Sequence, residues 1–434
     1  LPLPLVLFAL GDAALAAPSP PKPPSQLHVP LTRRNPRSDV DPHLRARWAK
    51  EVIERKYNGG LAKRSSGFNA LGNQDSDRSY YGSIAVGTPP VAYDVILDTG
   101  SADLWLAQSG CTGCDSNAET FNPSSSSSFR DLSTPFSVQY GSGQANGKLG
   151  SDSVQIAGLQ VTNQSFGVCN SFTTDLVNAP VSGLLGLAWQ PLATSRATPL
   201  WQALFQGNAL DSPLMAFHLT RFHNVNSAAD LEPGGTFTLG AVNNSLFTGD
   251  IDYQDIPSGE VVYWTLPLTK LTVGGNEVSL PSSSDAVIDT GTTLVGGPSG
   301  VIAALYAQIP GSSSQPDSSG FYTYPCSTSV NISLSFGTGP AWAINPDDFI
   351  FNQVSATQCQ GAFFVQSTGG GGTPPWIIGD TFLKNVYAVF RASPPSVGFA
   401  ALSAAAEQQS GSRRVPAPTP TIGSVGASVQ ATGN

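Results

Sequence analysis

The sequence predicts an all-β protein built from two similar lobes, with only a few short helices. From Tyr80 onward it consists mostly of short runs in which apolar and polar residues alternate, separated by Gly, Ser, Asn and Pro, as is typical of strands and turns. A duplication is the second observation. Asp-Thr-Gly occurs at Asp98 and again at Asp289, 191 residues apart, each time directly after a short apolar run. Such a repeat in a chain of 434 residues indicates two related halves, each long enough for its own core.

The elements can be placed by residue range. Two helices should begin with proline and carry an apolar stripe, at 199–206 and 298–308, and each should cover a sheet. A further helix should open at Asp41-Pro42 and end at Asn58-Gly59-Gly60. The strands are expected at 81–86, 93–97, 136–140, 154–161, 237–239, 261–266 and 286–288.

Charge is sparse and unevenly distributed. Only 12% of residues are charged, about half the usual share. Residues 1–64 hold 11 basic and 5 acidic residues, a net charge of +6, whereas the remainder holds 10 basic and 25 acidic residues, a net charge of −15. A basic front part and an acidic body predict an intramolecular partner lying over an acidic cleft, and they argue against nucleic-acid binding by the body.

The ends of the chain resemble processed segments. Residues 1–17 look like the apolar part of a secretory signal, with Ala14-Leu15-Ala16 as its cleavage site, and this run is too short and too rich in proline to span a membrane. A propeptide is expected over 18–64, ending at the dibasic Lys63-Arg64. The predicted lobes are 65–250 and 251–402, with the cleft between them. A flexible Ser/Thr/Pro/Gly-rich tail is predicted over 403–434.

The two Asp-Thr-Gly motifs predict a catalyst with two carboxylates. Each aspartate should stand where a strand ends and a loop begins, and Gly100 and Gly291 allow the sharp turn. Ser101 and Thr292 each follow their glycine. Their hydroxyls can hold one carboxylate in a single orientation.

Further residues bring in a family. The run Val95-Ile96-Leu97-Asp98-Thr99-Gly100-Ser101-Ala102-Asp103-Leu104-Trp105 resembles the pepsin-like aspartic proteases. So do Tyr140-Gly141-Ser142-Gly143, which matches the family's flap, and the paired segments Gly183-Leu184-Leu185-Gly186 and Trp376-Ile377-Ile378-Gly379. The resemblance covers roughly residues 80–402. It implies the bilobal pepsin-like fold with a central active-site cleft.

The resemblance also implies an activity and roles for residues. The chain should be a secreted aspartic endopeptidase, or alternatively a vacuolar one, that is active in acid, cleaves polypeptides, is inhibited by pepstatin-type compounds and is a monomer. Thr99 and Thr290 should bond across to the opposite loop, and the Tyr140 hydroxyl should reach Trp105. Ser142 replaces an acid that helps some relatives accept basic residues, so bulky apolar residues are expected around the cut.

Two roles are open to alternatives. Ile96, Val181 and Leu184 are candidate walls of the substrate pocket, but they could equally be core. Lys56-Tyr57 resembles the pro-region pair whose lysine lies between the catalytic aspartates and keeps the zymogen inactive, although Lys56 could also be a solvated helix residue.

The five cysteines predict disulfides, as expected of a secreted chain. Cys326 with Cys359 matches a family disulfide, whereas the pairing of Cys111, Cys114 and Cys169 is left open, including a free thiol. Asn163, Asn243 and Asn331 begin N-glycosylation sequons.

Rival functions have weaker support. A non-catalytic relative would have lost an aspartate, the flap tyrosine or the glycines, and none is missing. A glycosidase, which also uses two carboxylates, would need them farther apart and subsites rich in aromatic residues. No HExxH, G-x-S-x-G or P-loop motif occurs, so no metal and no cofactor is expected.

Overall fold

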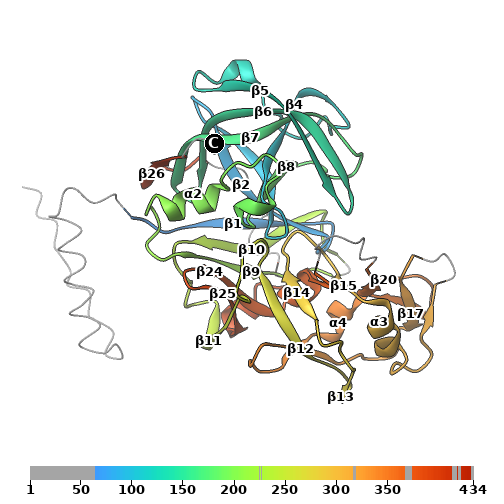
Figure 1. The fold of residues 1–434 in the computed structure, drawn as a ribbon. Coiled ribbons are helices and arrows are strands. Elements are labelled where there is room, and N and C mark those ends of the chain that lie inside the picture. Colours follow the sequence, from blue (N-terminus) through green and yellow to red (C-terminus); the bar gives the residue numbers. More distant parts are fainter. Residues whose placement is uncertain are drawn as a thin grey trace, which may run out of the picture. The chain divides into compact units, whose positions relative to one another are not determined.

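The computed structural model describes residues 64–223, 225, 227–315, 319–366, 374–412, 418 and 422–431. The predicted signal segment, the helix opening at Asp41-Pro42 and the Lys56-Tyr57 pair lie outside these ranges. Residues from Gly60 onward form one unit. Within it strands dominate and the helices are short, so the all-β prediction is confirmed (Figure 1).

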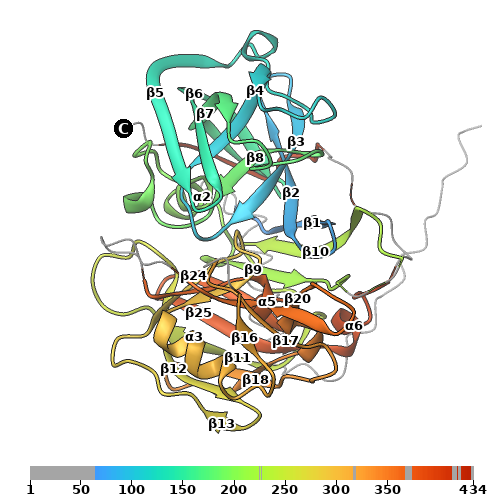
Figure 2. The same ribbon diagram turned by 90° about the vertical axis from the view of Figure 1, so that its right-hand side faces the viewer.

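One large sheet runs through both halves of this unit. Its first part curls into the upper lobe of Figure 2, where β2 pairs both with β3 and, at its far end, with β6. These strands are β1 (Gly67–Gln74), β2 (Ser79–Val86), β3 (Val91–Asp98), β4 (Leu104–Thr112), β5 (Arg130–Tyr140), β6 (Gly143–Ile156), β7 (Leu159–Phe172), β8 (Val181–Gly186) and β26 (Ala427–Gln430).

The sheet then continues through antiparallel strands from both halves of the chain. The order is β1, β10, β9, β24, β25 and β11, so residues 214–217 of β9 pair with residues 388–391 of β24. The lobe boundary predicted near Asp250 falls inside β11, where the two halves share this sheet. These strands are β9 (Leu214–Leu219), β10 (Leu231–Leu239), β11 (Phe247–Asp255), β24 (Val386–Ala392) and β25 (Pro395–Leu402).

Two further sheets form the lower lobe. The larger contains β12 (Thr265–Val273), β13 (Asn276–Glu277), β14 (Asp285–Ile288), β15 (Val295–Gly297), β18 (Ile332–Phe336), β19 (Trp342–Ile344), β22 (Phe363–Val365) and β23 (Trp376–Ile378). The smaller contains β16 (Ser313–Ser314), β17 (Tyr322–Pro325), β20 (Ile350–Gln353) and β21 (Gln358–Gly361).

The helices are short. The two predicted in the body are confirmed as α2 (Leu200–Gln206) and α3 (Ser299–Tyr306), each with a proline as its N-cap residue. The other helices among the residues that the structure describes are α4 (Pro346–Phe349), α5 (Asp380–Leu383), α6 (Ala404–Glu407) and the 3-10 turns η1 (Pro123–Ser125) and η2 (Gln190–Leu192).

Two predicted strands are wrong. The run 154–161 is a hairpin, because Ala157 and Gly158 have positive φ angles of 50° and 75° and turn the chain between β6 and β7, as tight hairpins require. Of the run 261–266, only Thr265 and Leu266 belong to a strand, β12. The backbone before them bonds to the other half instead, where Trp189 N donates to the Val262 carbonyl at 3.3 Å.

The predicted flexible tail is wrong for the part that the structure describes. Residues 404–407 form α6, with the Ser403 side chain capping its N-terminus. Residues 427–430 form β26, which pairs in parallel with β7. Their sequence carries no strand signal strong enough to predict this, because only Ala427 and Val429 of these four residues face the protein.

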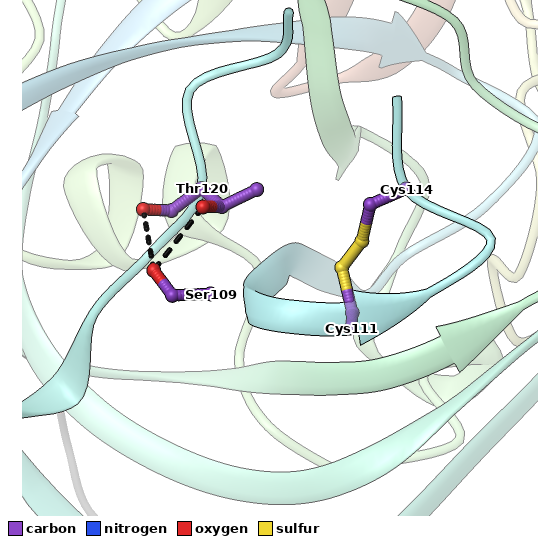
Figure 3. The surroundings of a disulfide bond; sticks show 4 residues. All are labelled: Ser109, Cys111, Cys114 and Thr120. Carbon is purple, nitrogen blue, oxygen red and sulfur yellow. Dashed lines mark hydrogen bonds between the residues drawn. A yellow bond between two sulfur atoms is a disulfide. The ribbon is translucent and has the colours of Figure 1, made fainter. Parts of the chain in front are cut away.

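The cysteine pairing left open by the sequence has a definite arrangement. Cys111 and Cys114 form a disulfide at the end of β4 (Figure 3), beside a loop that the Ser109 and Thr120 side chains tie together. Cys169 is a buried free thiol. It lies on β7 opposite Ala107, and both residues belong to the same buried apolar cluster. The predicted Cys326–Cys359 disulfide is confirmed, with Cα atoms 5.0 Å apart.

Candidate active site

The two Asp-Thr-Gly loops meet where two similar pairs of parallel strands end. Asp98 is the last residue of β3, which runs parallel to β8, the strand of the first apolar-apolar-Gly segment. Asp289 follows β14, which runs parallel to β23, the strand of the second such segment. Leu187 N donates to the Asp98 carbonyl at 2.7 Å, and Asp289 N donates to the Ile378 carbonyl at 2.9 Å. Each catalytic candidate is therefore fixed by its own neighbouring strand.

The two threonines tie the loops to each other. The Thr99 hydroxyl donates to the Ile288 carbonyl at 2.8 Å, and the Thr290 hydroxyl donates to the Leu97 carbonyl at 2.6 Å. In return, Thr99 N donates to Thr290 Oγ1 at 3.1 Å and Thr290 N donates to Thr99 Oγ1 at 3.0 Å. These four bonds connect residues 189 to 193 positions apart and hold the loops as one rigid piece.

Each carboxylate is oriented by its own loop. Gly100 N donates to Asp98 Oδ1 at 2.7 Å, and Gly291 N donates to Asp289 Oδ1 at 2.8 Å. Ser101 Oγ donates to Asp98 Oδ2 at 2.5 Å, and Thr292 Oγ1 donates to Asp289 Oδ2 at 2.7 Å. The inner and outer oxygens of the two groups therefore have the same partners in both loops.

The carboxylates also face each other across the glycines. A Cβ atom added to Gly100 would lie 2.5 Å from Cγ of Asp289, and one added to Gly291 would lie 2.5 Å from Cγ of Asp98. Only glycine permits such an approach. Burial, and then the charge of Asp289, hold the pKa of Asp98 well above its usual range, as expected for a carboxyl that is buried beside another carboxylate.

The predicted flap stands beside this pair. Tyr140 ends β5, and Gly141-Ser142 connects it to β6, which begins at Gly143 with a φ of 152°. Trp105 Nε1 donates to the Tyr140 hydroxyl oxygen at 2.9 Å. Burial, and then the charge of Asp98, raise the pKa of Tyr140 well above its usual range. Tyr140 therefore lies near enough to Asp98 for the two groups to interact.

The candidate pocket residues lie in the same cluster as the flap. Val181 and Leu184 are buried together with Trp105 and Tyr81, and the partly buried Ile96 and Tyr140 pack against them. Of the three predicted wall residues, only Ile96 keeps part of its surface exposed.

A buried cluster of charges near the second loop was missed by the sequence analysis. Lys384 Nζ lies 2.8 Å from Asp77 Oδ2 and 3.0 Å from Asp348 Oδ1, and Arg221 Nη2 lies 2.6 Å from Asp348 Oδ2. Asp77 and Lys384 border a hollow of about 260 Å³ that Thr293 and Leu294, next to Thr292, also line. One signal could have revealed the cluster. Lys384 follows Thr381-Phe382-Leu383, and a lone lysine beside an apolar run in a chain poor in charge is a candidate for a buried ion pair.

The amino-acid sequence that forms these loops matches a known family over most of the chain. The family model described as eukaryotic aspartyl protease covers residues 79–402. The chain belongs to the eukaryotic aspartyl proteases. Its enzyme class is that of the aspartic-type endopeptidases.

Several relatives agree with this family. The chain is 39% identical to major aspartyl peptidase 1 of Cryptococcus neoformans var. grubii, covering 92% of this chain and 87% of that protein. It is 34% identical to an aspartic protease of Phaffia rhodozyma, over 83% of this chain and 87% of that protein. It is 31% identical to pepsin A of Rhinolophus ferrumequinum, over 75% and 81%.

Two findings bear on other classes of protein. Among the residues that the structure describes for this aspartyl protease, no helix is both long and apolar enough to cross a membrane. In the same residues, no group of three or more His, Cys, Asp or Glu side chains is arranged to hold a metal ion.

Proposed function

We propose that the chain is an endopeptidase active in acid, in which Asp98 and Asp289 activate one water molecule, and that it is made as a secreted zymogen. The observation that carries this proposal is the mutual approach of the two carboxylates, each lying against the other's glycine. At about 3 Å and an effective dielectric of about 20, two negative charges repel by roughly 5 kcal/mol. One of the two therefore keeps its proton in acid, as is established for aspartic proteases in general.

A shared proton supplies both halves of the reaction. The ionised carboxylate takes a proton from the water, whose oxygen attacks the carbonyl carbon of the peptide. The protonated carboxyl donates its proton to the carbonyl oxygen, and a tetrahedral diol forms. The carboxyl group that took the proton from water passes it to the amide nitrogen, and the C–N bond breaks. One hydroxyl of the diol returns its proton to the other carboxylate, which leaves a carboxylic acid and an amine. The two protonation steps belong to the pair and not to either aspartate alone.

The supporting residues keep the pair in one geometry. Thr99 and Thr290 lock the loops, and Ser101 and Thr292 hold the outer oxygens. Such support matters because an error of about an ångström in position costs rate. Tyr140, on a hairpin with glycines at both sides of its tip, closes over the bound peptide.

The preferred substrates are polypeptides with bulky apolar residues around the cut. Ile96 is the best-supported wall residue, because it is partly exposed and packs against the same cluster as Tyr140. Val181 and Leu184 shape the pocket from beneath. Ser142 in the flap offers no negative charge to a basic side chain.

The precursor is kept inactive by its basic segment. Residues 1–64 carry +6 against −15 for the rest of the chain, and the ammonium of Lys56 neutralises the ionised dyad near neutral pH. Acid protonates carboxylates and weakens this attraction. Cleavage after Lys63-Arg64 leaves Ser65 as the first residue, and Ser65 N donates to the Ala209 carbonyl at 2.8 Å.

A cleavage assay across pH tests the proposal. The processed protein is incubated with denatured haemoglobin from pH 2 to pH 7, with and without pepstatin. Cleavage should peak in acid and stop with the inhibitor. Cleavage that peaks at neutral pH, or that ignores the inhibitor, contradicts the assignment.

The zymogen claim has its own test. Lys56→Ala should make the precursor active near neutral pH, whereas Lys50→Ala, a matched change in the same segment, should not. Equal latency in both variants contradicts the role of Lys56, and N-terminal sequencing of the secreted protein reports whether it begins at Ser65.

A further inference from the structure

The C-terminal segment of the described chain adds a strand to the first lobe. Ala427, Ser428, Val429 and Gln430 pair in parallel with Leu159 to Thr162 of β7. Backbone bonds close both ends of this ladder, with Gly426 N donating to the Gly158 carbonyl at 2.6 Å and Ala431 N to the Thr162 carbonyl at 2.9 Å. In Figure 1, β26 lies next to β7 and α2.

We propose that this edge of β7 is a strand-addition site for an extended peptide, that its occupant is the chain's own segment 422–431, and that occupancy holds the start of the mature chain in place. Strand addition of this kind uses backbone bonds for affinity and alternate side chains for selectivity.

The edge needs a cover. The first residues of β7 bond to β6 on one side, while β4 pairs with β7 only from Gly167 onward. Without β26, residues 159–162 would present unpaired backbone groups on their other side, and an open edge of this kind invites pairing with other chains. Leu159 and Val161 are buried. Loss of β26 would therefore leave an edge that is apolar as well as unpaired.

The side chains of β26 alternate as a docked strand requires. Ala427 is buried and Val429 and Ala431 pack against the main core, whereas Ser428 and Gln430 are exposed. Val429 fits over Gly207 at the end of α2, where an added Cβ would lie 2.5 Å from Val429 Cγ1. Gly207 has a φ of −76°, an angle that any residue adopts. A substitution at Gly207 therefore obstructs the strand without straining the backbone.

The same place holds the first residues after the dibasic pair. Asp211 N donates to the Ser65 carbonyl at 3.0 Å, and a Cβ added to Gly426 would lie 3.0 Å from Ser65 Oγ. The predicted first residue of the mature chain thus lies against the segment that contains β26. This link to processing rests on the proposed function, whereas the strand site itself does not.

The test removes the occupant and returns it as a separate molecule. The chain is ended after Ser412, and a synthetic peptide of residues 422–434 is added. We expect the truncated protein to melt roughly 3–6 °C lower than the full chain, and the peptide to restore the melting temperature saturably. A peptide carrying Val429→Asp should fail, whereas one carrying Ser428→Asp should act like the original.

Full-length variants keep the test decisive if the truncated protein does not fold. Val429→Asp and Gly207→Val should speed hydrogen exchange of the amides at 159–162 and at 65–66 by at least tenfold, and Ser428→Asp should not. Equal melting temperatures with and without 413–434, or equal exchange in Val429→Asp and Ser428→Asp, would overturn the proposal. The melting temperature and hydrogen exchange do not depend on proteolytic activity. A protein without the proposed enzymatic activity could therefore still pass or fail this test of the strand site.

Discussion

Two pairs of buried aspartates in this protein show how surroundings decide what a carboxyl group does. In the catalytic pair, Asp98 and Asp289 face each other with hydroxyl and N–H donors around them. In the second pair, Asp77 and Asp348 both bond to Lys384, and Arg221 binds Asp348 from the other side. All four carboxylates are buried.

The pKa of Asp98 and the pKa values of Asp77 and Asp348 move in opposite directions. Burial, and then the negative charge of Asp289, raise the pKa of Asp98. Burial alone would also raise the pKa values of Asp77 and Asp348, but Lys384 and the hydrogen bonds around them lower both. A cation between two carboxylates therefore keeps both ionised to lower pH, and we call this ion-paired cluster the fastener. A second carboxylate instead gives a group that holds a proton in acid.

This difference suits a protein that works in acid. The fastener joins the β1–β2 turn to residues 348 and 384 of the other half. Its aspartates have lowered pKa values in the folded state, so their contribution to stability is present above their unfolded pKa of about 3.9 and is lost as pH falls through the lower folded values. The fastener thus survives where the dyad takes up its proton.

The largest effect is expected from breaking the dyad. Asp98→Asn or Asp289→Asn removes the group that accepts or donates the proton, so kcat/KM on an apolar peptide should fall by about 10³-fold or more. Asp250→Asn, on exposed β11, is the matched control and should keep full activity. Either dyad variant retaining a tenth of the activity would refute the two-carboxylate mechanism.

Removing the cation of the second pair comes next. Lys384→Met leaves Asp77 without a cation, and breaking a buried pair in this way costs about 3–5 kcal/mol of unfolding free energy. Urea unfolding at pH 6 measures this cost. Lys270→Met removes an exposed lysine 3.7 Å from Glu277, so it should cost less than about 1 kcal/mol. Equal losses in the two variants would mean that the buried cluster is no fastener.

The pH dependence of stability sharpens the comparison. Between pH 4 and pH 2 the unmodified protein should lose unfolding free energy as protons displace Lys384 from Asp77 and Asp348. Lys384→Met should lose less over the same range, because Asp77 then takes up its proton without breaking an ion pair. Parallel stability curves for the two proteins would show that the cluster does not titrate as described.

The smallest effect on stability is expected at a third kind of buried carboxyl group, one without a cation or a second carboxylate beside it within the described ranges. Asp94 on β3 accepts a hydrogen bond from Ser83 at 2.6 Å, and burial raises its pKa to about 6. A raised pKa favours the protonated form, so this group lowers stability as pH rises from about 4 to 6. In Asp94→Asn this fall should be absent. The unfolding free energy of the variant, relative to that of the unmodified protein, should therefore rise by up to about 3 kcal/mol between pH 4 and pH 7. An unchanged slope would show that Asp94 is not buried as described.

The sequence predicted what local motifs encode. Asp-Thr-Gly followed by a hydroxyl residue requires a strand end, a sharp turn and an oriented carboxylate, and these features depend on neighbours within three positions. The family resemblance then supplied the contacts between Thr99 and Thr290 and between Tyr140 and Trp105. The helices at 199–206 and 298–308 were predictable from a proline start and an apolar stripe.

Features that depend on distant partners were not predictable. Asp77, Arg221, Asp348 and Lys384 come from four separate segments of the chain. The apolar residues before Lys384 mark only that lysine as a candidate for a buried ion pair, and no local pattern names its partners. β26 has a weak apolar pattern, because β7 and α2 supply most of the apolar surface. The hairpin turn at 157–158 was missed because alanine at position 157 is not a typical turn residue, and Gly158 alone is a weak turn signal.

Neutron diffraction at pH 4.5 on a deuterium-exchanged crystal would test the central claim most directly, since it locates protons in both aspartate pairs at once. We predict a single deuteron shared by the Asp98 and Asp289 carboxylates, none on Asp77 or Asp348, and three on Lys384. Two bare carboxylates at the catalytic pair, or a deuteron on Asp77, would contradict the account.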